Sequence, residues 1–219
     1  MEELNCDTVF TIPFVNIQVS EATVVTWIIM AVLVAASVLL TRNLKVIHPG
    51  RRQLLLEAFI SKIYDFFYGI LGKEGSRYIP YLMCVAVYIG VANLVGIFGF
   101  KAPTKALNVT AGLAMMSIFL IEYAGFHQKG VKGWLHSFAE PVAVVAPINV
   151  LEILIRPLSL CMRLFGNVLG AFVIMELIKL VIPVGFPAVL SLYFDVFDGL
   201  IQTYVFVFLT ALFVREAIE

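Results

Sequence analysis

The chain has 219 residues, of which 61% are hydrophobic and only 14% are charged, and its mean hydropathy is +0.98. A soluble domain carries roughly a quarter charged residues, so this composition predicts a protein whose main solvent is lipid. The formal net charge is zero, which argues against a nucleic-acid partner. The three cysteines lie far apart without metal-ligand spacing, so we expect no metal site, no disulfide framework and no cofactor.

The N-terminal part of the chain predicts one retained membrane span. The first residues, MEELNCD, are acidic where a signal peptide would be basic. Residues 23–41 are uncharged and close to the length of about 20 residues that crosses a bilayer. Acids precede this segment and bases follow it, so the positive-inside tendency places residues 1–22 outside and the next loop in the cytoplasm.

Residues 51–73 predict an amphipathic helix rather than a span. Apolar residues recur at helical spacing, and Glu57, Ser61 and Asp65 lie elsewhere on the helical wheel. Such a helix lies in the membrane interface. A short helix of a cytosolic subdomain is the alternative.

The rest of the chain predicts two further spans and a long hairpin. Residues 80–100 and 108–126 are apolar segments joined by a short outer turn, and a basic loop follows them on the cytoplasmic side. The stretch 142–217 is broken near Pro183 and Pro187 into two helices, which are too long to stand upright and should be strongly tilted. The predicted fold class is an all-α integral membrane protein, one membrane domain with about five membrane-embedded helices and one interfacial helix.

Within the hairpin, one arginine lacks a nearby acid. Arg163 stands in the apolar run LSLCMRLFGN, with no Asp or Glu within one helical turn; Asn167 lies one turn further, and Glu152 returns to nearly the same azimuth. Arginine stays charged at any cellular pH, so its partner must come from another helix, from water in a cavity or from another protein. A structural ion pair to Asp195 or Asp198 across the hairpin is the alternative.

The second hairpin helix carries a single polar stripe. Asp195, Asp198 and Gln202 follow i, i+3, i+7 spacing on an otherwise apolar helix. Two neighbouring carboxylates repel each other when both are ionised, so one should hold a proton or have a cation nearby. This suits transit of protons or cations. A hydrogen-bonded stripe that holds the helices together is the alternative.

Other charges near helix ends have simpler interpretations. Glu122, Arg215 and Glu216 are expected to be interfacial anchors. Glu176 and Lys179 are three residues apart and could pair. By default, ionisable residues at membrane depth mark ion or substrate pathways.

The run PINVLEILIRPLSLCMRLFGN, followed by a second helix with a central glutamine in LIQTYVFVFLTALFV, resembles subunit a of bacterial F-type ATP synthases. The resemblance extends upstream to VANLVGIFGF and LNVTAGLAMM. It implies that Arg163 faces a rotating ring of c subunits, whose carboxylates carry H⁺, or alternatively Na⁺, between two offset aqueous half-channels. It also implies a non-catalytic subunit that touches no nucleotide.

The resemblance further implies partners, location and residue roles. The partners are the c-ring, the b subunits of the peripheral stalk and the lipid of a bacterial inner membrane, with the N-terminus outside and the C-terminus in the cytoplasm. Asn167 and Gln202 match polar positions that flank the arginine in the family. Glu152 matches the acid that follows the Pro-Ile-Asn segment, although the spacing to the arginine is a few residues shorter here.

One position departs from the family pattern. Nine residues beyond the arginine many relatives carry an acid, where this chain has Phe172. Glu176, one turn later, is expected to take that role, and Asp195 stands where relatives often have an ionisable residue. We therefore expect Glu176 and Asp195, with Asp198, to line the outer half-channel.

Two other classes of protein remain as alternatives. A small secondary transporter would also have charges at the membrane midplane and broken helices, but such proteins are often built from internal repeats, which this sequence lacks. An integral membrane enzyme has no support, because the sequence contains neither an HExxH nor a GxSxG motif.

Overall fold

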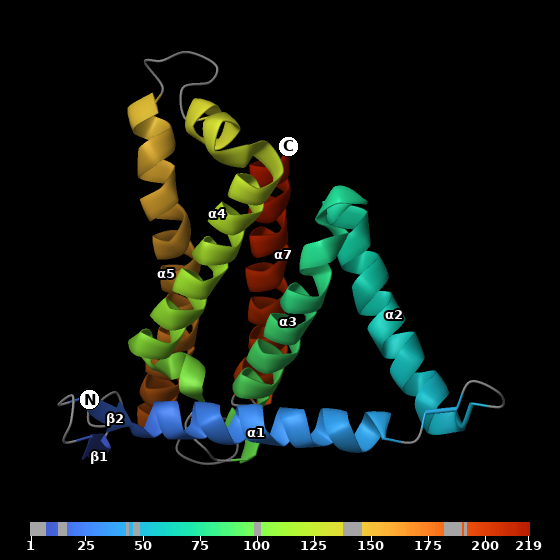
Figure 1. Cartoon of the computed structure of the whole chain (residues 1–219). Coiled ribbons are helices and arrows are strands. Elements are labelled where there is room, and N and C mark those ends of the chain that lie inside the picture. Colours follow the sequence, from blue (N-terminus) through green and yellow to red (C-terminus); the bar gives the residue numbers. More distant parts are fainter. Residues whose placement is uncertain are drawn as a thin grey trace.

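The computed structural model describes residues 8–12, 17–42, 44–45, 49–98, 102–137, 146–181, 190 and 192–219. Over these ranges the protein is almost entirely helical, which confirms the predicted fold class (Figure 1). Five segments are long and apolar enough to cross a membrane: Glu21–Thr41, Glu74–Leu94, Leu107–Val131, Leu151–Ile178 and Val196–Ile218.

A short β-hairpin precedes the first helix and was not predicted. Strand β1 (Thr8–Ile12) pairs antiparallel with β2 (Ile17–Ser20), with Ile12 opposite Ile17. Both strands are rich in Thr, Val and Ile, residues that favour the extended conformation. Each strand is so short that its pattern does not stand out in a sequence in which most segments are apolar.

Helix α1 (Glu21–Thr41) lies across the ends of the bundle helices instead of running beside them (Figure 1). Only 6% of its apolar span is buried. Tyr88 of helix α3 (Ile79–Leu94) donates a hydrogen bond to the Thr26 hydroxyl at 3.2 Å and holds α1 in place. Since an exposed face this apolar requires a non-aqueous environment, α1 has the surface of a lipid-facing span.

Helix α2 (Arg51–Leu71) contacts the bundle through its C-terminal part and leads away from it at its N-terminal end (Figure 1). Its buried residues are Phe67 and Leu71, and the Phe66 ring lies 5.6 Å from the ring of Tyr204 on α7 (Gly199–Ile218). The free part of α2 exposes Leu55 as well as Glu57. Such a helix has the amphipathic surface expected of an interfacial segment.

The bundle consists of α3 (Ile79–Leu94), α4 (Leu107–Ser137), α5 (Ala146–Val181) and α7 (Gly199–Ile218). Helix α4 packs between α5 and α7, and α3 packs on α7 and continues into the 3₁₀ turn η3 (Val95–Phe98). The core of the bundle contains fully buried side chains from all four helices: Ile79, Leu82, Ile89, Ile121, Leu164, Phe206 and Val214. α5 and α7 contact each other much less than each contacts α4.

Helix α4 extends further than the sequence predicted. The expected span ends at residue 126, but the helix continues to Ser137 with an interruption at Gly130. There φ is 71° and ψ is 170°, values in the left-handed half of conformational space that favour glycine. The chain therefore bends at this residue, and the last turns of α4 lean over the end of the bundle (Figure 1).

The second half of the predicted hairpin begins with a π-helical turn, η6 (Tyr193–Asp198), which leads directly into α7. π-Helical turns insert an extra residue into a helix and occur frequently at functional sites. The other half, α5, has 36 residues and is about 54 Å long at 1.5 Å per residue. This exceeds the thickness of a hydrocarbon core of about 30 Å, as the sequence predicted.

Candidate functional site

Arg163 lies on an open face of α5. Its side chain is exposed, whereas Leu160 and Leu164 beside it are buried against the bundle. Within the described ranges Arg163 forms no hydrogen bond and no ion pair. A Cβ atom placed on Gly166 or Gly170 would meet no atom within 4 Å. Another surface can therefore approach this face of α5 closely.

The surroundings of Arg163 on this face are apolar. Only 17% of the α5 span is buried, and the exposed polar residues one turn from the arginine are Ser159 and Asn167. A permanent cation in an apolar, membrane-spanning surface requires a counter-charge. Among the described residues none forms an ion pair with Arg163. The exposed large hydrophobic residues of α5 are Leu151, Leu154, Ile155, Leu158, Met162, Val173, Ile174, Leu177 and Leu180.

A second arginine, two turns earlier on α5, is in the opposite situation. Arg156 donates from Nη2 to Glu152 Oε2 at 2.8 Å and to Glu216 Oε1 at 2.7 Å. Its guanidinium carbon lies 5.2 Å from the centre of the Phe213 ring, and the side chain is 18% exposed. The fold thus neutralises Arg156 internally and ties α5 to the end of α7.

A polar cavity of about 310 Å³ lies beside this pair, where α4, α5 and the C-terminal end of α7 meet. Trp134 donates from Nε1 to Glu122 Oε2 at 3.0 Å in its wall, and Glu152, Arg156 and Glu216 contribute the opposite side. A volume of this size has room for several water molecules. The cavity can therefore admit water and small cations to one end of α5.

Of the residues that line this cavity, the sequence predicts Glu152 as a site residue but not Glu122, Trp134 or Glu216. The sequence predicts Glu122 and Glu216 to be interfacial anchors and places Trp134 in the cytoplasmic loop after residue 126. These residues come from three different helices, α4, α5 and α7, and the signal in the sequence is that each of these helices carries a charge in the part that lines the cavity.

The remaining predicted residues whose side chains the structure describes do not form one bonded cluster. Gln202 is buried in the bundle at 5% exposure, and Asp198 is half-buried at the end of η6. No hydrogen bond or ion pair joins Arg163 to Asn167, Gln202 or Asp198 in the part of the chain that the structure describes. The side chain of Asp195 lies outside the described residues, as does that of Lys179.

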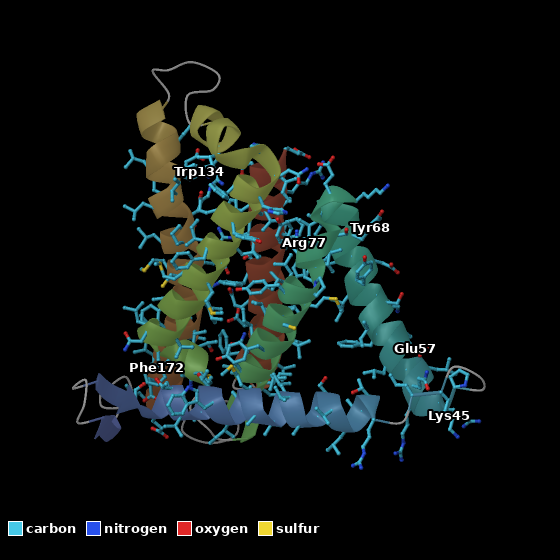
Figure 2. All side chains as sticks on the ribbon, viewed as in Figure 1. Lys45, Glu57, Tyr68, Arg77, Trp134 and Phe172 are labelled. Carbon is cyan, nitrogen blue, oxygen red and sulfur yellow. The ribbon has the colours of Figure 1, made fainter. Side chains whose placement is uncertain are left out.

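Two predicted acids flank the arginine along α5. Glu152 lies about 16 Å from Arg163 along the helix axis and Glu176 about 20 Å on the other side, at 1.5 Å per residue. Glu176 is half-buried and takes part in an interaction of its own. Phe172, one turn before it, lies under Lys105, whose Nζ is 5.8 Å from the ring centre. Figure 2 shows Trp134 and Phe172 toward opposite ends of the bundle, so the two acids belong to different ends.

A buried polar node fixes the start of α7. Asn93 donates from Nδ2 to the Gly199 carbonyl at 2.9 Å, and it accepts a bond at Oδ1 from the Thr104 hydroxyl at 2.8 Å. The Thr203 hydroxyl also donates to Gly199 O, at 2.8 Å. A Cβ on Gly199 would lie 3.0 Å from that of Asn93, so glycine permits this close approach. The node therefore sets the position of η6 and its acidic residues relative to α3.

Replacing Asn93 with leucine is expected to lower the free energy of unfolding by about 1–3 kcal/mol, because the buried Thr104 hydroxyl loses its acceptor and the Gly199 carbonyl loses one of its two side-chain donors. The fraction of detergent-solubilised protein that stays folded on heating measures this loss. Asn108→Leu is the matched control, since Asn108 is exposed at the start of α4. Equal melting of the two variants would disprove a stabilising role for the node.

Comparison with known proteins matches nearly the whole chain to one family. The sequence profile of the family described as "ATP synthase A chain" matches residues 23–215. The "ATP synthase subunit a" of Moorella thermoacetica is 37% identical over 195 residues, which cover 89% of this chain and 88% of that protein. "ATP synthase subunit a 2" of a Bradyrhizobium species is 33% identical, covering 92% and 90%. "ATP synthase subunit a, sodium ion specific" of Propionigenium modestum is 31% identical, covering 88% and 72%.

Proposed function

Because the chain belongs to the ATP synthase A chain family, it is an ion-translocating, non-catalytic stator subunit of the membrane sector, and we propose that Arg163 is the charge that faces the c-ring. The observation that carries this proposal is the contrast between two arginines on one helix. Arg156 is paired twice within the chain, whereas Arg163 is exposed on an open face with no partner among the described residues. The missing counter-charge is the carboxylate that each c subunit brings past.

In this mechanism an ion enters one half-channel, binds a ring carboxylate and leaves through the other half-channel after the ring has turned. The guanidinium of Arg163 favours the ionised form of the arriving carboxylate and so makes it release its ion. Because arginine keeps its proton, the same charge repels cations that would otherwise pass directly between the half-channels. Each elementary charge that crosses gains about 2.3 kcal/mol per 100 mV, which drives the rotation.

The two half-channels are proposed at opposite ends of α5. The polar cavity of about 310 Å³ beside Glu152 supports an inner half-channel at the end of the bundle where α7 ends. The outer one is assigned to Glu176, Asp195 and Asp198, supported by the position of Glu176 beyond Arg163 on the other side. Asn167 and Gln202 are assigned to the zone between them, where ions transfer to and from the ring.

The chain is a multi-pass membrane protein of a multisubunit complex. We assign it to a bacterial inner membrane, with residues 1–22 outside and the C-terminus in the cytoplasm, on the basis of the basic residues that follow α1. The amphipathic α2 then lies at the cytoplasmic interface, next to the C-terminal end of α7, where Arg215 donates to the Ile70 carbonyl at 3.3 Å. The proposed partners are the c-ring and the b subunits of the peripheral stalk.

The transported ion is proposed to be H⁺. Na⁺ is the second candidate, because a relative that covers 88% of the chain is named sodium ion specific. The choice depends largely on the binding site of the ring.

Purification through a tag on this chain, followed by reconstitution into vesicles, tests the function. We expect a c-ring and b subunits to copurify, and ATP to drive acidification of the vesicle interior at the same rate with and without sodium. Uptake that requires sodium would reassign the ion. Purification of the chain alone, with transport that does not depend on ATP, would instead favour a secondary transporter.

A further inference from the structure

We propose that Glu216 keeps the inner half-channel attractive to cations by neutralising Arg156. This inference rests on the proposed function and adds a residue that was expected only to anchor α7 at the interface. The carboxylate that matters is contributed by the last turns of α7 and acts on a guanidinium of α5.

The geometry makes Arg156 a fixed charge in the wall of the cavity. Its Nη2 is shared between Glu152 and Glu216 at 2.8 and 2.7 Å, and the Phe213 ring lies against the guanidinium. A guanidinium in this place is a permanent positive charge on the path proposed for cations. With Glu152 alone beside it, the pair would be neutral. The second carboxylate makes the group of three residues net negative by one charge.

The other charged groups of the cavity wall leave this balance in place. Glu122 is held by Trp134, and Glu219 forms an ion pair with Arg215 at 2.7 Å. Lys129 adds one further positive charge at the wall. Among the residues that the structure describes, four carboxylates line the cavity against two cationic side chains, and Glu216 is one of these four carboxylates. A cavity lined by one sign of charge concentrates ions of the other sign.

The experiment uses the whole complex in inverted vesicles, whose outer face is the cytoplasmic side. The rate of ATP-driven proton uptake is measured against external pH and normalised to the amount of assembled complex. For Glu216→Gln we expect about a tenfold higher proton concentration at half-maximal rate, a shift of about one pH unit downward, with the same maximal rate at low pH.

Three variants separate charge from structure. Glu216→Asp keeps the charge and should stay near the wild-type profile. Arg156→Gln combined with Glu216→Gln removes the bridge but restores one net negative charge through Glu152, so it should return the profile toward wild type. Glu57→Gln is the matched control on the exposed part of α2 and should change nothing.

Each outcome decides the proposal. If Glu216→Gln leaves the dependence of proton uptake on external pH unchanged, the proposal is wrong. It is also wrong if the double variant is as impaired as Glu216→Gln alone, because the ion pair would then have only a structural role. If Glu216→Gln does not assemble, a Glu216→Asp profile shifted as far as one unit overturns it as well. A wild-type complex that does not pump overturns the proposed function itself, which distinguishes the two failures.

Discussion

Replacing Arg163 with alanine is expected to stop ATP-driven ion uptake while the complex stays assembled. A carboxylate about 6 Å from a guanidinium, at an effective dielectric constant of about 20, gains roughly 3 kcal/mol, which favours its ionised form about a hundredfold. Without this charge the ring carboxylates keep their ions as they pass, so ATP hydrolysis moves no ions. Uptake by reconstituted vesicles, relative to the amount of subunit a in the complex, measures the effect.

Assembly should survive the change because Arg163 is exposed and makes no bond to any described residue. Arg163→Lys keeps the positive charge but not the planar fork of donors, and should retain part of the activity. Arg42→Ala, an exposed arginine at the end of α1, is the matched control and should pump normally. Normal pumping by Arg163→Ala would refute the central role of this residue.

Neutralising Glu176 and Asp195 together (Glu176→Gln, Asp195→Asn) is expected to block the outer half-channel. A cation at membrane depth costs about 2.5–3.5 kcal/mol without a compensating group, so the loss of both acids should slow ion passage about a hundredfold. The rate of proton-driven ATP synthesis in vesicles measures this slowing, because synthesis requires ions to enter from the outer side.

The control for this variant is the equivalent double change on α2, Glu57→Gln with Asp65→Asn. Both residues are exposed, and each bonds only within α2 among the described residues, so synthesis should be unaffected. If the double variant of Glu176 and Asp195 makes ATP at the wild-type rate, the outer half-channel lies elsewhere. The Arg163 assignment would stand in that case.

Most of the fold could be predicted from local properties of the sequence. Apolar length reveals a membrane helix by itself, because a span must satisfy its own backbone hydrogen bonds. The extension of α4 could not be predicted in this way, since residues after 126 are polar and contain glycines that usually end a helix. The β-hairpin could not be predicted either, because its two strands are too short for an alternating pattern of apolar and polar residues to be recognised.

The candidate site also contains residues that could be predicted from the sequence and residues that could not. Arg163 stands out in the sequence because its lack of an acidic neighbour is a property of one helix. The pair of Arg156 and Glu216 spans sixty residues, and that of Asn93 and Gly199 spans 106, so neither can be read from spacing along one helix. Such contacts depend on which helix ends meet, which is decided by packing of the whole bundle.

The crosswise position of α1 has a mechanical consequence. Figure 1 shows α1 crossing the ends of the bundle helices, so with α1 spanning the bilayer as proposed, those helices recline toward the membrane plane. Glu152 and Glu176, about 36 Å apart along α5 at 1.5 Å per residue, are then displaced mainly sideways rather than in depth. Ions would then bind to the ring and leave it at two different positions around its circumference. An ion can pass from one position to the other only when the ring rotates.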